Sequence, residues 1–156
     1  MAQPITEGER PESIGITPRL PANQRDDLEQ ILFFNANQHR VRLGIQLSIE
    51  TYGAPAIHVE NGLLRIRVGE MPGVENLFAV SATGRLLGVA VFACLADERF
   101  VVLHLGLQAR RIGAPDVNAP VLRRLMYEIR RAARLTRGVD RIELVYKDCH
   151  SMRVTG

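Results

Sequence analysis

The sequence predicts an α+β fold: a mostly antiparallel, twisted sheet of about six strands with an N-terminal helix and a C-terminal amphipathic helix. Three observations favour it. Short runs with alternating apolar residues recur along the chain, as in Leu63–Val68. Two stretches, 24–38 and 118–137, have apolar residues at helical spacing instead. Turn signals such as Asn61-Gly62 separate neighbouring runs. Whether the helices cover one face of the sheet or both is left open.

The first 21 residues are polar, contain four prolines and show no hydrophobic period. Such a composition is typical of a flexible arm, because it offers no apolar face to bury. We therefore expect an N-terminal arm over residues 1–21 and a single α+β domain over residues 22–156. A chain of this length is long enough to bury a core.

The first helix is expected at about Gln24–Gln38, with Asn23 as a candidate cap and acidic residues in its first turns. The next run, Val41–Ile49, alternates apolar and polar residues at every position. Strict alternation predicts a half-buried strand. A helix that continues through this run is the competing interpretation.

Five further strands are expected before residue 108. Asn61-Gly62 tolerates positive φ and indicates a hairpin between two of them. Three more strands follow with short turns between them, as in an antiparallel meander. The expected strands are Ala56–Val59, Leu63–Val68, Asn76–Val80, Arg85–Ala93 and Phe100–Leu107.

The most informative stretch is 100–146, which has the order strand, basic loop, amphipathic helix, strand. Asn118 and Pro120 indicate the start of the helix, and Gly138 is placed to end it. Arg141–Tyr146 is the strand that follows. The two strands of this unit are expected to lie close together in one sheet.

The loop Gln108–Ala114 lies between a strand end and a helix start and contains Arg110 and Arg111. Backbone N–H groups at a helix start point outward and favour a negative charge, so a pyrophosphate suits this loop. The alternative is that both arginines are ordinary solvated charges of a loop.

The run from Val101 to Tyr146 resembles the core of the GNAT superfamily of N-acetyltransferases. In that family an apolar strand leads into a loop of the form Gln/Arg-x-x-Gly-x-Gly/Ala, whose amides hold the pyrophosphate of acetyl-coenzyme A, and a helix follows. The similar segment here has a single glycine and a longer entry into the helix. The resemblance implies that acetyl-coenzyme A binds at Gln108, Arg110, Arg111, Ile112, Gly113 and Ala114.

The resemblance also implies an N-acyltransferase that acts on an amine of a small molecule or a peptide. The family pattern continues with a further helix and two strands after the position of Tyr146, and this sequence shows only ten more residues, 147–156. The resemblance is therefore to a divergent and truncated member. The alternative function is a catalytically inactive binding or scaffold module of the same fold.

Two residues are candidates for the chemistry. His104 lies in the middle of a strand, and its ordinary pKa is close to working pH, so it could accept the proton of an amine. The alternative is a hydrogen-bonded histidine of the core or sheet edge. By the resemblance, Tyr146 would protonate the departing thiolate. Its alternative is a tyrosine packed on the sheet edge with a solvated hydroxyl.

Composition narrows the class of protein. No apolar run is long enough to span a bilayer, and the N-terminus lacks the pattern of a secretory signal, so a cytoplasmic location is expected. Two cysteines, Cys94 in an apolar run and Cys149, indicate no disulfide framework, and we expect Cys94 in the core. The four histidines show no metal-ligand spacing.

The positive charge is concentrated near the C-terminus. Residues 108–141 contain nine arginines and three acidic residues, which suits an anionic ligand or an acidic partner. Aromatic residues are scarce among these arginines, Tyr127 being the exception, which argues against a nucleic-acid partner. A homodimer is compatible with the sequence but is not indicated by any motif.

Overall fold

A computed structural model describes residues 13–33, 49–95, 99–108, 118–139, 141–144 and 150–153. The predicted α+β class is confirmed, and so is a sheet of about six strands. The main sheet has the strand order β1-β5-β6-β7-β8-β9. Its strands are β1 (Gly15–Thr17), β5 (Glu75–Val80), β6 (Leu86–Cys94), β7 (Arg99–Leu107), β8 (Arg141–Leu144) and β9 (His150–Arg153).

All neighbouring strands of this sheet are antiparallel except β7 and β8. These two are parallel because the helix α3 (Asn118–Leu135) carries the chain back between them. The expected closeness of the strands at either end of the basic loop and helix is confirmed, since they are direct neighbours.

A second sheet of three strands has the order β2-β4-β3, with β2 at Leu20–Pro21, β3 at Pro55–Glu60 and β4 at Leu63–Val68. The sequence patterns predict no such separation into two sheets. The predicted hairpin turn is confirmed, because Asn61 and Gly62 both have positive φ between β3 and β4.

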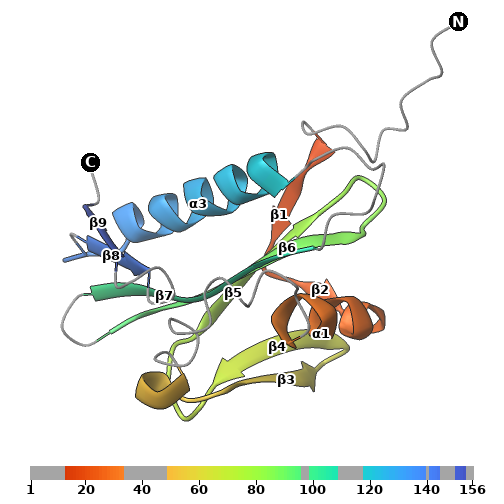
Figure 1. Cartoon of the computed structure of the whole chain (residues 1–156), viewed down its shortest axis with the longest axis horizontal. Coiled ribbons are helices and arrows are strands. Elements are labelled where there is room, and N and C mark those ends of the chain that lie inside the picture. Colours follow the sequence, from red (N-terminus) through yellow and green to blue (C-terminus); the bar gives the residue numbers. More distant parts are fainter. Residues whose placement is uncertain are drawn as a thin grey trace, which may run out of the picture.

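The helices cover opposite faces of the main sheet (Figure 1), which answers the question left open above. On one face α3 buries Val121, Leu125 and Ile129 against β6 and β7. On the other face α1 (Arg25–Phe33) and the three-stranded sheet share a second core. The molecule therefore has three layers, with β6 and β7 buried at the centre.

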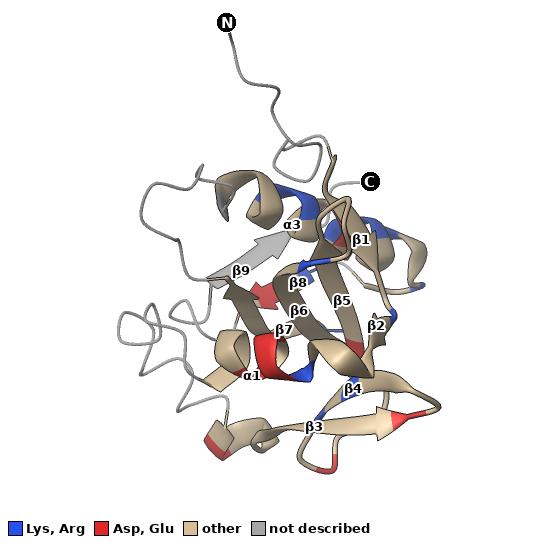
Figure 2. Ribbon diagram, turned by 90° about the vertical axis from the view of Figure 1, so that its right-hand side faces the viewer, with Lys and Arg blue, Asp and Glu red and all other residues tan. Residues whose placement is uncertain are grey.

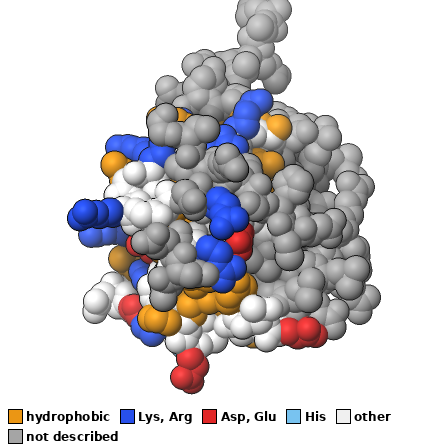
Figure 3. Space-filling model, turned by 90° about the vertical axis from the view of Figure 1, so that its left-hand side faces the viewer, with side chains coloured by type: hydrophobic (Ala, Val, Ile, Leu, Met, Phe, Trp, Pro, Cys, Tyr) orange, Lys and Arg blue, Asp and Glu red, His pale blue; other side chains and the backbone are white. Residues whose placement is uncertain are grey.

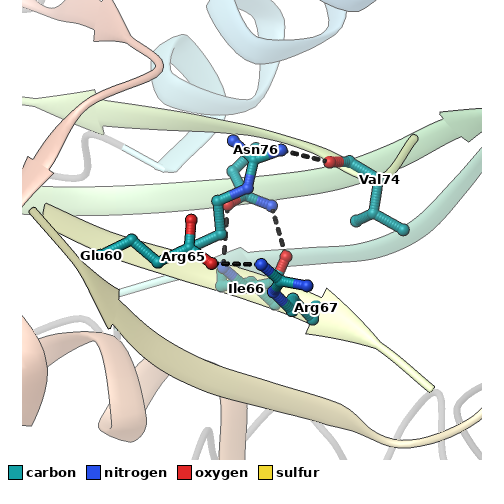
Figure 4. A network of polar contacts seen from close by, with 6 residues as sticks. All are labelled: Glu60, Arg65, Ile66, Arg67, Val74 and Asn76. Atoms are coloured by element: carbon teal, nitrogen blue, oxygen red, sulfur yellow. Dashed lines mark hydrogen bonds and ion pairs between the residues drawn. The ribbon is translucent and has the colours of Figure 1, made fainter. Parts of the chain in front are cut away.

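A buried asparagine joins the two sheets (Figure 4). The side chain of Asn76 on β5 accepts a hydrogen bond from the N–H of Ile66 at 2.9 Å and donates one to its C=O at 3.1 Å. Beside it Arg65 donates to the C=O of Val74 at 2.9 Å. The amide takes the place of a neighbouring strand along this part of β4.

Several boundaries differ from the sequence-based expectations. Strands β1 and β2 lie within the expected arm, so the ordered sheets begin at Gly15; residues 1–12 lie outside the described part, and the division into arm and domain stays a prediction. Asn23 is not a helix cap, because a 3-10 turn over Ala22–Gln24 already precedes α1 and Pro21 occupies the cap position. Of the expected helix 24–38, residues 34–38 lie outside the described part.

Two further expectations are wrong at single residues. Ile49 lies in a helical turn over residues 49–52, and its C=O accepts from the N–H of Gly53 at 2.9 Å. The strand expected to end there is wrong at this residue, and its other positions, 41–48, are not described. Cys94 is exposed rather than part of the core, because it is the last residue of β6.

Among the described helices, none is long and apolar enough to cross a membrane.

Candidate functional site

The candidate site lies at the carboxyl end of β7, between the two helices. Gly106 on β7 contacts α1 so closely that a Cβ atom there would lie 2.5 Å from Cγ2 of Ile31. Gly88 on β6 allows a similarly close approach of α3 on the other face, where a Cβ atom would lie 2.9 Å from Cγ1 of Val121. These two glycines bring the first turn of α3 and the end of α1 onto opposite faces of the sheet at one point.

The parallel pairing of β7 with β8 covers only part of β7. It runs from Arg99 opposite Arg141 to Val102 opposite Leu144. β7 continues for five more residues, Leu103–Leu107, past the last described residue of β8. The exposure of the strand changes along the same stretch, from buried at Phe100–His104 to half-buried at Leu105–Leu107. The carboxyl end of β7 is thus more accessible to solvent than the middle of the strand.

A β-bulge on β7 decides where His104 lies. On β6, Val91 pairs with His104, whereas the next residue, Phe92, pairs with Val102. Leu103 is therefore the extra residue of the bulge. Since cross-strand partners share a face, His104 lies on the face of Val91, which is the face that α1 covers. Without the bulge, simple alternation would have placed His104 on the face of α3.

His104 is buried, with 8% of its surface exposed. In the described part of the chain its Nε2 atom has no hydrogen-bond partner. Burial lowers the pKa of this imidazole from 6.5 to about 4, because the charged form loses its hydration. The side chain is therefore neutral at pH 7 and presents one unpaired ring nitrogen to the interior.

The predicted cofactor loop is described only at its first residue. Gln108 is half-buried, and its N–H donates to the C=O of Leu87 on β6 at 2.9 Å. This bond extends the β6–β7 ladder by one residue and holds the start of the loop against the sheet. The other predicted contacts, Arg110, Arg111, Ile112, Gly113 and Ala114, lie outside the described residues, as does Tyr146.

The outer face of α3 is strongly basic (Figure 2). Its exposed arginines are Arg123, Arg124, Arg130, Arg131 and Arg134. Glu128 is the one acidic residue of the helix, and its Oε2 atom lies 3.8 Å from Nη1 of Arg131. Arg137, between α3 and β8, and Arg141, the first residue of β8, are also exposed. Figure 3 shows Lys and Arg side chains, in blue, spread over this end of the molecule. The helix that follows the loop thus adds a positive field to its surroundings.

His104 and the start of the loop are candidates that the sequence suggests, but the features that position them are not apparent in it. The bulge at Leu103 leaves no mark in the sequence of β7, so only the pairing register reveals it. Gly88 and Gly106 did carry a signal, because an isolated glycine inside a strand pattern indicates a bulge or a close approach of another element. In the described residues no cluster of three or more histidine, cysteine or acidic side chains could hold a metal ion.

Comparison with solved structures finds similar proteins, among them two acetyltransferases. No family model matches the chain, and no curated protein matches it. The crystal structure of nourseothricin acetyltransferase is similar at a TM-score of 0.44 and 17% identity, over 85% of this chain and 72% of that one. A putative streptothricin acetyltransferase from Bacillus anthracis, in complex with acetyl coenzyme A, is similar at a TM-score of 0.43 and 14% identity, over 85% and 74%.

Proposed function

We propose that this protein is a GNAT-type N-acyltransferase of the cytoplasm, which binds acetyl-coenzyme A at the carboxyl end of β7 and acylates the amine of a small molecule or peptide. The observation that supports it most is the parallel β7–α3–β8 crossover, in which a loop with two arginines lies between a strand end and a helix start. Such a junction favours phosphate groups through backbone N–H groups and the helix dipole.

The described residues fit such a ligand in two respects. The half-buried end of β7 offers apolar surface at Leu105 and Leu107, suited to a thin, partly apolar arm. Arg123 and Arg124, in the second turn of α3, are exposed and add positive charge near the start of the helix. Gln108, Arg110, Arg111, Ile112, Gly113 and Ala114 would hold the pyrophosphate. When bound, acetyl-coenzyme A supplies an activated acetyl thioester.

His104 has a defined role in this proposal. Its unpaired Nε2 lies in a buried position four residues before Gln108, where it could form a hydrogen bond with an acceptor amine. A neutral imidazole can do this, but a pKa of about 4 makes it a weak base at pH 7. We therefore assign His104 to hold and orient the acceptor nitrogen, and Tyr146 to give a proton to the leaving sulfur.

The low pKa of His104 favours a second candidate function, a binding module that holds the cofactor without turnover. A general base works best when its pKa is near the operating pH, and that of His104 is well below it. Binding of acetyl-coenzyme A without acetyl transfer to any amine would support this candidate.

The first experiment is thermal unfolding of the full chain with and without acetyl-coenzyme A. A ligand at about 100 times its dissociation constant adds roughly 2.7 kcal/mol to the free energy of unfolding. We expect a clear rise in Tm that is lost in the double variant Arg110→Ala/Arg111→Ala. The control is Arg131→Ala/Arg134→Ala, which removes the same charge from the far end of α3 and should keep the rise.

Turnover is then measured as release of free thiol from acetyl-coenzyme A in the presence of a panel of primary amines. No rise in Tm at millimolar acetyl-coenzyme A would refute both candidates. A rise in Tm without thiol release for any amine would support the binding module and refute the transferase. Release that depends on His104 and Tyr146, with binding retained in His104→Asn and Tyr146→Phe, would establish the transferase.

A further inference from the structure

The outer edge of β3 is an open strand edge. In the three-stranded sheet β3 pairs with β4 on one side, and no described strand pairs with its other side. Four of its six side chains, Ala56, His58, Val59 and Glu60, are exposed, and Val59 is 51% exposed. Within the described residues the edge is therefore open, and it borders the half-exposed Val59.

The contact between Asn76 and Ile66 shows which backbone groups of β3 point outward. Both the N–H and the C=O of Ile66 bond to Asn76, on the side of β4 away from β3. Ile66 lies opposite Ile57, so these two residues form a non-hydrogen-bonded pair. Because the bonding direction alternates along an antiparallel ladder, Ile57 and Val59 direct their N–H and C=O groups to the open edge.

In the part of the chain that the structure describes, this edge has neither a bulge nor a positively charged side chain, two devices by which proteins prevent edge-to-edge pairing. The register with β4 is continuous over all six residues, so no bulge bends the strand away. The strand contains no lysine or arginine, and Pro55 stands at its first position, where it leaves the other N–H groups in place. Glu60 is its one acidic residue, and it is bound to Arg67 of the same chain.

We propose that two copies of this protein associate by antiparallel pairing of their β3 strands around a two-fold axis at His58. In this register Ile57 of each copy lies opposite Val59 of the second copy, and each pair exchanges two N–H to C=O bonds. Both outward N–H groups of each strand are then satisfied. The half-exposed Val59 is covered by another β-branched side chain, a favourable cross-strand pair.

The side chains of the outer face agree with this register. Glu60 lies opposite Ala56 of the second copy, so the acidic groups of the two strands do not face each other. The pair of sheets becomes one six-stranded sheet with the order β2-β4-β3-β3-β4-β2. This association does not depend on the acetyltransferase activity, because β3 lies in the other sheet from β7.

The first test measures molar mass by size-exclusion chromatography with light scattering, at loading concentrations from about 1 to 500 µM, a range that covers weak interfaces. We expect the mass to rise toward twice that of the chain. Val59→Lys places a charge on the edge and should keep the mass at one chain, with an unchanged far-UV circular dichroism spectrum. Tyr127→Lys is the control, since Tyr127 is 54% exposed on α3 and should not affect the mass.

The second test fixes the register by cross-linking. In a background with Cys94→Ser and Cys149→Ser, His58→Cys should form an intermolecular disulfide on mild oxidation. Facing residues of a non-hydrogen-bonded pair have Cα atoms about 4.5 Å apart, within disulfide range. Ala56→Cys, on the same face, should not cross-link, because its counterpart lies opposite Glu60. A monomer at every concentration, a dimer that survives Val59→Lys, or cross-linking through Ala56→Cys would overturn the proposal.

Discussion

The side-chain amide of Asn76 bonds to both backbone groups of Ile66, the residue that lies ten positions earlier in the chain. Asn76 is 5% exposed and Ile66 is fully buried, so these bonds are shielded from water in the native structure. Beyond the short β2, the inner edge of β4 has no other strand beside it in the described residues. This one side chain therefore forms the hydrogen bonds that the backbone of Ile66 would otherwise lack, and it holds the second sheet against the first.

Replacement of Asn76 by alanine should destabilise the protein by about 2–4 kcal/mol, because it leaves a buried N–H and a buried C=O of Ile66 unpaired. Urea unfolding followed by circular dichroism measures this change. Asn76→Asp should cost at least as much, since the carboxylate can accept from the N–H but faces the C=O of Ile66 with a negative charge. A loss below about 0.5 kcal/mol in the alanine variant would mean that water or a rearranged strand takes over both bonds.

Gly106→Ala should destabilise the protein by about 1–3 kcal/mol, because the added methyl group meets Ile31 and α1 must shift away from the sheet. Thermal or urea unfolding measures the loss. The matched control is Gly15→Ala, where the nearest atoms to an added Cβ are at ordinary contact distance, 3.7 Å and beyond, so its cost should be much smaller. If both variants lose the same stability, close packing of α1 on Gly106 is not what makes the glycine necessary.

His104 makes stability depend on pH in a defined window. Its pKa is about 4 in the folded protein and 6.5 ordinarily, so the unfolded chain binds the proton more readily between these values. Stability contributed by the neutral imidazole is complete above about pH 6.5 and is lost as the pH falls toward 4. The loss from this group amounts to about 3 kcal/mol.

The comparison of wild type with His104→Leu tests this dependence. The leucine variant should unfold with less dependence on pH between 4 and 6.5 than the wild type. Chemical denaturation at half-unit pH steps provides the profile. Parallel profiles for wild type and His104→Leu would show that His104 is hydrated or paired in solution.

Much of the fold could be predicted because apolar residues recur along its strands and helices at spacings typical of each. The meander β5–β6–β7 and the helix α3 begin within one residue of the expected positions, although β6 and β7 are buried on both faces and do not alternate. The turn at Asn61 and Gly62 was predictable for a local reason, since both residues tolerate positive φ.

The features that the sequence did not reveal depend on tertiary contacts. The sequence pattern of a strand is the same whichever sheet the strand joins. Only the strand pairing therefore shows that β2, β4 and β3 form a separate sheet. Alternation at Ile49 was overridden by helical structure, as short periodic patterns often are. At the candidate site, the bulge that turns His104 toward α1 is a property of the β6–β7 register. The positions of Arg110–Ala114 and Tyr146 stay predictions.

The pairing of β1 with β5 joins residues far apart in the chain, Ile16 with Ala79, whereas β5, β6 and β7 meet through short turns. Closing a long loop costs entropy before any contact compensates for it, so the meander should form early in folding and β1 should dock last. The same order should appear in reverse under native conditions. Amide hydrogens of β1 should exchange with solvent through local opening, long before those of β6, whose exchange requires the whole domain to unfold.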